Sequence, residues 1–162
     1  MDWRKEPANR LTKQMQLVYI ESELMNYYWH LSEWRRYDQL ITELRARYQE
    51  ELEHPGCGSS IIRMPDGSSQ RSPWQIELSG KLYELEESQR IEERYLSRVD
   101  RWMSVCTPAQ EKMVRQYVMV QQCRDAKLAA DRTGYSIINL YKTRERVLKK
   151  IYSRFFLKEY NF

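Results

Sequence analysis

The chain has 162 residues, of which 41% are hydrophobic and 31% charged, and its formal net charge is +4. This length suits one domain, or one small domain with an extended helical part, and the composition favours an ordered protein. The polar N-terminus disfavours a signal peptide, and no apolar run approaches the ~18 residues of a membrane span, so we expect a cytoplasmic protein with no membrane partner.

The cysteines and histidines are the residues most able to carry catalysis or to hold a metal ion. Cys57, Cys106 and Cys123 lie far apart and match no CxxC or Cys/His metal spacing, so we expect reduced thiols. His30 and His54 are isolated, without a triad-like or metal-ligand neighbourhood in the sequence. The sequence therefore predicts no catalytic residues, no metal site and no cofactor, and we do not expect an enzyme.

The first two thirds of the chain have the pattern of two long amphipathic helices. From residue 17 to residue 52, apolar and aromatic residues recur every three or four positions without Gly or Pro, which predicts one continuous helix. Residues 54–73 are rich in Pro, Gly and Ser and predict a loop. A second helix is expected over residues 73–105, with an apolar side made of Ile76, Leu82, Leu85, Ile91, Tyr95, Val99 and Met103.

Two long helices joined by a loop predict an antiparallel helical hairpin. The apolar stripe of such a long helix needs a partner, which is either the other helix of the same chain or a second copy of the protein. The sequence therefore predicts an interaction or dimerisation part over residues 1–105, and a homodimer through the long helices remains an open alternative.

The third part of the chain begins with a strong helix-start signal. Thr107 is placed to cap a helix, Pro108 suits its first position, and Gln110 completes a capping box. A short helix rich in small residues is expected from about Asp125 to Thr133. Gly134 then suits a helix C-terminus with positive φ, and Ser136 suits the N-cap of a last helix from Ile137 to about Phe155.

A helix, a tight turn containing Gly and a second capped helix is the helix-turn-helix arrangement, in which the second helix enters the major groove of DNA. The basic residues of the chain concentrate in the same place. Residues 124–162 hold ten Lys/Arg against four Asp/Glu, whereas residues 1–56 hold eight against ten. The sequence thus predicts an all-α protein, a long helical hairpin plus a C-terminal helix-turn-helix DNA-binding domain over residues 106–162.

The expected last helix divides into a core side and an exposed side. Its helical spacing places Leu140, Val147, Leu148 and Ile151 toward the core. Asn can hydrogen-bond adenine, Lys can donate to guanine and Ile can touch thymine methyl groups. The candidates for contact with base edges are Ile137, Ile138, Asn139, Tyr141 and Lys142. The candidates for contact with DNA phosphates are Arg132, Arg144, Arg146, Lys149 and Lys150.

The segment LAADRTGYSIINLYKTRERVLKKI, residues 128–151, resembles the helix-turn-helix of the promoter-reading C-terminal domain of bacterial sigma factors. The shared pattern is an Ala-rich helix, a Gly, a capping Ser/Thr, a recognition helix and a Lys-rich end. The resemblance covers about residues 107–151. The chain departs from that family in lacking the acidic and arginine-rich start of the recognition helix.

The wider arrangement resembles the ArpU/RinA-like group of phage late-gene transcription regulators. The similar features are the helix beginning YIESEL, the loop containing PDGSS and the sigma-like C-terminal segment, which together span nearly the whole chain. This resemblance implies a phage or prophage activator in the host bacterial cytoplasm. Its implied partners are double-stranded promoter or operator DNA and host RNA polymerase.

Two other classes of protein remain open at the level of sequence. A small terminase subunit, which takes part in DNA packaging, also combines a helix-turn-helix with long assembling helices. A helical protein-binding adaptor would use the long helices for protein contacts and its basic end for nonspecific interactions. The aromatic set Tyr27, Tyr28, Trp29, Trp34 and Tyr37 can stack bases, but its helical spacing is more typical of a core or an interface.

Overall fold

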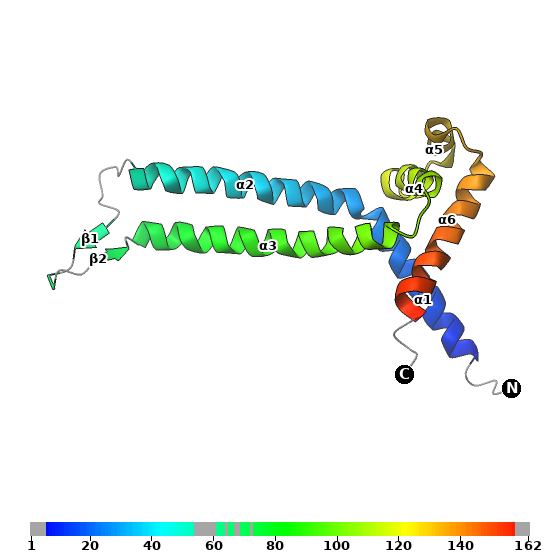
Figure 1. Ribbon diagram of the computed structural model, residues 1–162, viewed down its shortest axis with the longest axis horizontal. Coiled ribbons are helices and arrows are strands. Elements are labelled where there is room, and N and C mark those ends of the chain that lie inside the picture. Colours follow the sequence, from blue (N-terminus) through cyan, green and yellow to red (C-terminus); the bar gives the residue numbers. More distant parts are fainter. Residues whose placement is uncertain (1–5, 54–60, 64, 67–68, 72, 158–162) are drawn as a thin grey trace. The chain divides into compact units, whose positions relative to one another are not determined.

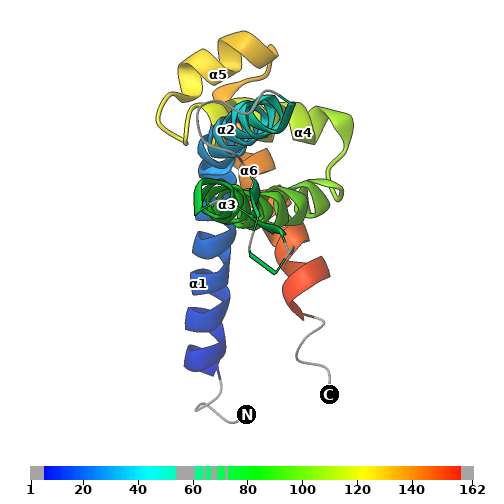
Figure 2. The ribbon, with the colours of Figure 1, turned by 90° about the vertical axis from the view of Figure 1, so that its left-hand side faces the viewer.

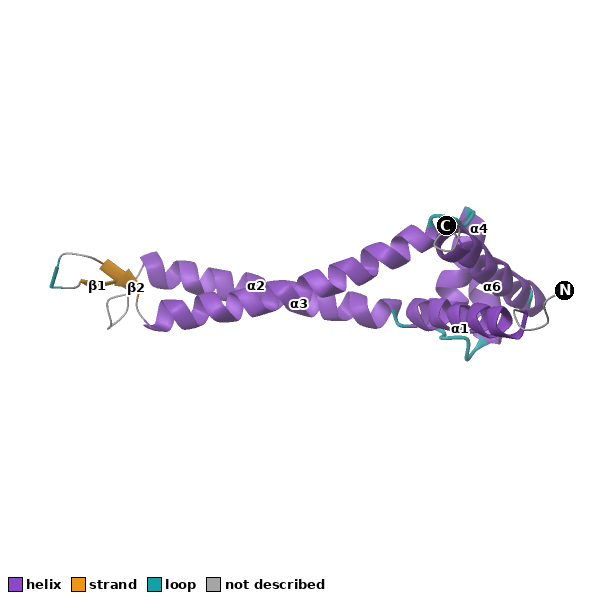
Figure 3. Ribbon diagram, turned by 90° about the horizontal axis from the view of Figure 1, so that it is seen from below, coloured by secondary structure: helices purple, strands orange, loops and turns teal. Residues whose placement is uncertain are grey.

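The computed structural model describes residues 6–53, 61–63, 65–66, 69–71 and 73–157 (Figure 1). Nearly all of the described residues are helical, which confirms the all-α fold class (Figure 3). The exception is a small antiparallel ribbon of β1 (Ile61–Arg63) and β2 (Ser69–Arg71), in which Ile61 pairs with Arg71. The segment 54–73, expected as a loop, therefore contains a short hairpin, and its residues 54–60 lie outside the described part.

The chain divides into two compact units. The first, here called the C-terminal unit, combines residues 1–30 with residues 95–162; the second, here called the hairpin unit, comprises Leu31–Arg94. This division differs from the boundary at residues 105/106 expected from the sequence. The reason is that α1 (Glu6–Met25) packs against helices of residues 115–156, which makes the N-terminal helix part of the C-terminal unit.

The first long helix is interrupted once. The sequence predicted one continuous helix, whereas the structure has α1 and α2 (Tyr27–Glu53) separated by a turn at Asn26. The backbone N–H of Asn26 still donates to Ser22 O at 3.2 Å, and His30 N–H donates to Asn26 O at 3.1 Å. Asn is a weak helix former, because its side chain competes for backbone hydrogen bonds, and Asn26 is the residue that separates α1 from α2.

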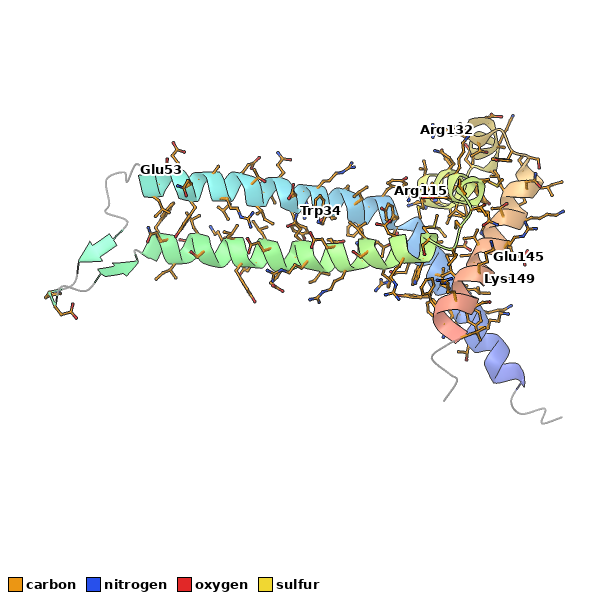
Figure 4. The ribbon with its side chains drawn as sticks, in the orientation of Figure 1. Trp34, Glu53, Arg115, Arg132, Glu145 and Lys149 are labelled. Carbon is orange, nitrogen blue, oxygen red and sulfur yellow. The ribbon has the colours of Figure 1, made fainter. Side chains whose placement is uncertain are left out.

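In the hairpin unit, α2 runs antiparallel to α3 (Pro73–Met103), as the sequence predicted. Polar contacts join the two helices along their length. The Trp34 indole N–H donates to Glu93 at 3.2 Å, and Figure 4 shows this side chain between the helices. Gln89 donates to Asp38 at 3.1 Å, and Arg45 forms an ion pair with Glu86 at 2.5 Å.

The predicted apolar side of α3 is wrong at two positions. Ile76 and Ile91 are 59% and 63% exposed, while Tyr95, Val99 and Met103 are buried. A helix turns by about 100° per residue, so Ile76 and Ile91 lie at least about 120° around α3 from Leu78, Leu82 and Leu85 of the hairpin unit. The apolar side predicted for α3 therefore covers more of the helix surface than the single partner helix α2 can bury.

The C-terminal unit contains the main core. It is built from α1, α4 (Pro108–Val114), the π-helix η1 (Arg115–Val120), α5 (Ala126–Thr133), α6 (Ile137–Ile151) and the π-helix η2 (Tyr152–Phe156), which pack together in Figures 1 and 2. The predicted capping box is confirmed: Gln110 N–H donates to Thr107 Oγ1, and Thr107 N–H donates to Gln110 Oε1. Buried apolar side chains include Ile20, Leu24, Val99, Trp102, Val114, Tyr117, Val118, Met119, Ala129, Leu140, Val147 and Ile151.

No helix among the described residues has both the length and the apolar character needed to cross a membrane.

Candidate nucleic-acid interface

The link between α5 and α6 is three residues long and is held by local hydrogen bonds. Asp125 caps α5 by accepting from Leu128 N–H at 3.0 Å. At the other end of α5, Gly134 has φ +76° and its N–H donates to Ala130 O at 2.8 Å. Ser136 then caps α6 by accepting from Asn139 N–H at 3.2 Å. Because the left-handed conformation strains residues with a Cβ, the turn favours Gly at position 134.

The buried residues of α6 fix which side of the helix faces outward. Leu140, Thr143, Val147, Leu148 and Ile151 are buried against the rest of the unit. The opposite side carries Ile138, Lys142, Glu145 and Lys149, spaced at intervals of three and four residues, and all four are exposed. Figure 4 shows Glu145 and Lys149 on this side of α6. The helix thus presents a continuous outward stripe that begins with an isoleucine.

The five base-edge candidates lie in the first two turns of α6, and all five are exposed. Ile138 is 64% exposed and Tyr141 is 49% exposed. One edge of the Tyr141 ring is supported by Tyr117, with ring centroids 5.8 Å apart. Lys142 forms no ion pair with any described residue. The start of α6 therefore offers apolar, amide, phenol and ammonium groups to a partner. Among these groups, the phenol of Tyr141 is held by its contact with Tyr117.

The five phosphate candidates do not form one equivalent set. Arg132 on α5, labelled in Figure 4, and Arg146 on α6 are exposed and have no ion-pair partner among the described residues. Lys149 pairs with the neighbouring Glu145 at 3.1 Å, and Lys150 donates to Gln110 Oε1 at 3.1 Å. The Lys149–Glu145 ion pair is exposed, so it contributes little and is readily exchanged for a phosphate, whereas the Lys150–Gln110 hydrogen bond is partly buried.

Arg144 differs from the other phosphate candidates because it already pairs with a carboxylate. One of its terminal nitrogens donates to both carboxylate oxygens of Glu21, at 2.7 and 2.5 Å. The Glu21 side chain is only 15% exposed, and Arg144 Nε is buried. Burial lowers the pKa of Arg144, but the hydrogen bonds and charge of Glu21 outweigh it and raise that pKa overall. Arg144 therefore holds α1 to α6, and a DNA phosphate would have to compete with Glu21 for its guanidinium.

A groove of about 440 Å³ runs between α1 and α6 beside this ion pair. Gln14 and Val18 of α1 line one side, and Tyr141, Lys142 and Glu145 of α6 line the other. Val18 is 69% exposed. The N-terminal helix therefore borders the outward face of α6, a contribution that sequence reasoning missed because residues 14–21 precede α6 by more than 100 positions.

A second hollow of about 530 Å³ lies along the C-terminal half of α6. It is lined by Arg146, Lys149, Lys150, Ser153 and Arg154, with no carboxylate among these residues. The first three basic residues are among the phosphate candidates predicted from the sequence. Arg154 is not among them, although it follows α6 in η2 and continues the same cationic surface. Arg154 could have been predicted from the sequence, because it continues the run of basic residues that begins at Lys142.

The two described cysteines are protonated thiols at neutral pH. Burial, together with the charge of Glu111, raises the pKa of Cys106 to about 11. Burial and the charge of Glu21 likewise raise the pKa of Cys123 to about 11. Neither residue has the low pKa of a nucleophilic thiol.

Cys57 and His54 lie outside the described residues. Among the residues that the structure describes, no group of three or more His, Cys, Asp or Glu side chains is arranged to hold a metal ion.

Comparison of the chain with protein-family models, with curated proteins and with solved structures found no match.

Proposed function

We propose that this protein is a sequence-specific DNA-binding transcription regulator, in which α5 and α6 form a helix-turn-helix and α6 is the recognition helix. The observation that carries this proposal is the exposed start of α6. Ile138, Asn139 and Lys142 project from a helix end that is capped by Ser136 and held at a fixed angle to α5 by Gly134. An α-helix fits the major groove of B-DNA, and the first turns of a recognition helix meet base edges there.

The side chains at this helix start have the chemistry for direct readout. A neutral amide such as Asn139 can donate to and accept from adenine, whereas the ammonium group of Lys142 donates to the acceptors of guanine. The exposed Ile137 and Ile138 side chains suit contact with thymine methyl groups, and their exposure otherwise costs free energy on a charged surface.

The basic residues around this stripe supply attraction to the backbone of DNA. Arg132 on α5 and Arg146 on α6 are exposed cations, and Lys149, Lys150 and Arg154 extend the positive surface toward the end of the unit. Contacts of this kind position a protein on the duplex and make its affinity fall as salt concentration rises. The proposal requires no catalytic step, metal ion or cofactor.

The resemblance of residues 107–151 to sigma-factor C-terminal domains, and of most of the chain to ArpU/RinA-like regulators, supports a narrower role. We infer a phage or prophage late-gene activator that binds promoter or operator DNA in the bacterial cytoplasm and assists host RNA polymerase. A test of this narrower role is transcription by host RNA polymerase in vitro. Added protein should raise transcript yield from a late promoter and leave an unrelated promoter unchanged.

The DNA-binding proposal is tested by a salt-titrated binding assay. The purified chain is bound to the intergenic DNA flanking its own gene and to scrambled duplexes of equal length and composition. Regulation through a specific site predicts a preference of about 10³-fold or more, with affinity for both duplexes falling steeply with salt. Equal affinity for both duplexes would contradict sequence-specific binding and favour a packaging subunit or an adaptor.

A further inference from the structure

The hairpin unit buries very little apolar surface for its length. Among its described side chains, the buried ones are Ile41, Gln75 and Leu78. Several large apolar side chains are instead half-buried or exposed, among them Leu40, Leu44, Leu82 and Leu85. Two helices alone cannot enclose a core, and antiparallel helix pairs usually gain one by packing on further helices.

A groove of about 520 Å³ runs between α2 and α3 within this unit. Its apolar lining comes from Leu40 and Leu44 on α2 and from Leu85 on α3. Ser88 and four charged side chains complete the lining, and the charged ones are Glu43, Arg47, Lys81 and Glu84. Two are acidic and two are basic, so the groove has no net charge, and each helix contributes one residue of each sign.

The antiparallel pairing of the helices sorts these four charges. The contacts of Arg45 with Glu86 and of Asp38 with Gln89 set the level at which each residue of α2 faces α3. By that pairing, Glu43 and Glu84 lie toward one end of the groove, whereas Arg47 and Lys81 lie about one helical turn away, toward the other end. The groove is therefore a leucine-lined surface with an acidic end and a basic end.

We propose that this groove binds the same groove of a second copy of the chain, around a two-fold axis that crosses the helices at right angles. Such an axis reverses the direction of the helices, so the acidic end of each copy lies over the basic end of its partner. Glu43 then faces the partner's Arg47 and Lys81 faces the partner's Glu84, and each pairing occurs twice. The leucines of both copies enclose the apolar core of an antiparallel four-helix bundle.

The state of the four side chains agrees with this arrangement. Arg47 and Glu84 form no ion pair with any described residue. Lys81 pairs with Glu77 at 3.2 Å, but both side chains are at least 60% exposed, so this pair is weak and can be exchanged. Glu43 accepts a neutral hydrogen bond from Gln39 at 3.0 Å and forms no ion pair with the part of the chain that the structure describes. A second copy is favoured over an unrelated partner because the charge pattern is complementary to its own rotated image.

The inference concerns the hairpin unit and does not depend on the proposed DNA binding. The test is sedimentation equilibrium of the full chain without DNA, for the wild type and two charge variants. The first variant, Arg47→Glu with Lys81→Glu, makes both ends of the groove acidic. The second, Glu43→Lys with Glu84→Lys, makes both ends basic. Each variant alone should dimerise at least ~10-fold more weakly than the wild type, because every facing pair now repels.

Mixing the two charge variants separates lost complementarity from lost folding. In an equimolar mixture, acidic grooves meet basic grooves, so a heterodimer should form with an affinity close to that of the wild type. The matched control, Arg35→Glu with Arg94→Glu, changes the net charge as much as the first variant but lies outside the groove lining, and it should dimerise like the wild type. Circular dichroism of each variant should retain the helical signal.

Three results would overturn the inference. A wild-type chain that remains monomeric up to high micromolar concentration would show that the groove has no second copy to bind. A dimer equally weakened by the control variant would place the contact elsewhere. Two charge variants that stay monomeric when mixed, while keeping their helical signal, would show that the charges do not face one another across a two-fold axis.

Discussion

Arg144 on α6 and Glu21 on α1 form a paired contact between residues 123 positions apart, with the arginine donating at 2.7 and 2.5 Å to the two oxygens of the carboxylate. The pair fastens the N-terminal helix to the proposed recognition helix. It also places the thiol of Cys123 next to the same carboxylate, at 3.8 Å. Through this contact, a residue predicted to bind phosphate stabilises the unit that contains α6.

Removing the carboxylate of this pair should destabilise the protein. Glu21→Ala leaves the guanidinium of Arg144 half-buried without its partner, and we expect a loss of about 2 kcal/mol in the free energy of unfolding. Glu145→Ala is the matched control, because it breaks an exposed ion pair on the same helix and should cost less than about 0.5 kcal/mol. Urea denaturation measures both, and equal effects would show that the buried pair has no special role.

The turn between α5 and α6 should be sensitive to its two key residues. Ser136→Ala removes the N-cap of α6 and should lower the free energy of unfolding by about 1 kcal/mol. Gly134→Ala places a Cβ at φ +76° and should cost about 1 kcal/mol, although no atom lies within 4 Å of that position. Gly80→Ala, in the interior of α3, is also unobstructed and should instead be neutral or stabilising. The same outcome for both glycines would argue against strain at Gly134.

The cationic surface should appear in the salt dependence of DNA binding. Arg132→Ala with Arg146→Ala removes two exposed cations that are candidates for phosphate contact, one on α5 and one on α6. If both contact DNA, the slope of log affinity against log salt should become shallower by about 2. Arg35→Ala with Arg94→Ala removes the same charge from the hairpin unit and should leave the slope unchanged. Equal slopes for all three proteins would show that DNA does not contact the two cations removed by the first variant.

The cysteines should react slowly in the folded protein. In a Cys57→Ser variant, Cys106 and Cys123 have pKa values of about 11, so at pH 8 both are thiols and alkylation by iodoacetamide should be much slower than in denaturant. Folding raises the pKa of each thiol above the ordinary 9.0, so the protonated thiols favour the folded state. Their contribution to the free energy of unfolding is present below pH 9 and is lost as pH rises through 11. Rapid alkylation of the native protein at pH 8 would contradict the burial of both thiols.

The sequence predicted those features that depend on neighbouring residues. The capping box at Thr107, the helix start at Ser136 and the buried side of α6 each follow from spacings of three or four residues, and the structure contains all three. The hairpin of two long helices was also predictable, because its apolar periodicity extends over many turns and the Pro/Gly/Ser-rich segment separates the two helices.

Features that depend on distant residues could not be predicted in the same way. No residue near Arg144 in the sequence indicates that its guanidinium pairs with Glu21. Arg144 was therefore predicted to be a free cation like its basic neighbours. The exposure of Ile76 and Ile91 depends on which side of α3 faces α2, and periodicity does not define that side. The break at Asn26 separates two segments with the same helical pattern, so only packing against other helices reveals it.

The central claim is that α6 reads DNA sequence, and its most direct test is selection of binding sites from a random duplex library, with wild-type protein and with Asn139→Ala, Lys142→Ala double-variant protein in parallel. The account predicts that the wild type enriches one defined motif. It also predicts that the double variant, although folded, loses preference at the positions contacted by these two side chains, where each good base contact is worth about 1–3 kcal/mol. Enrichment of no motif by the wild type, or of an identical motif by both proteins, would contradict the assignment of α6 as the recognition helix.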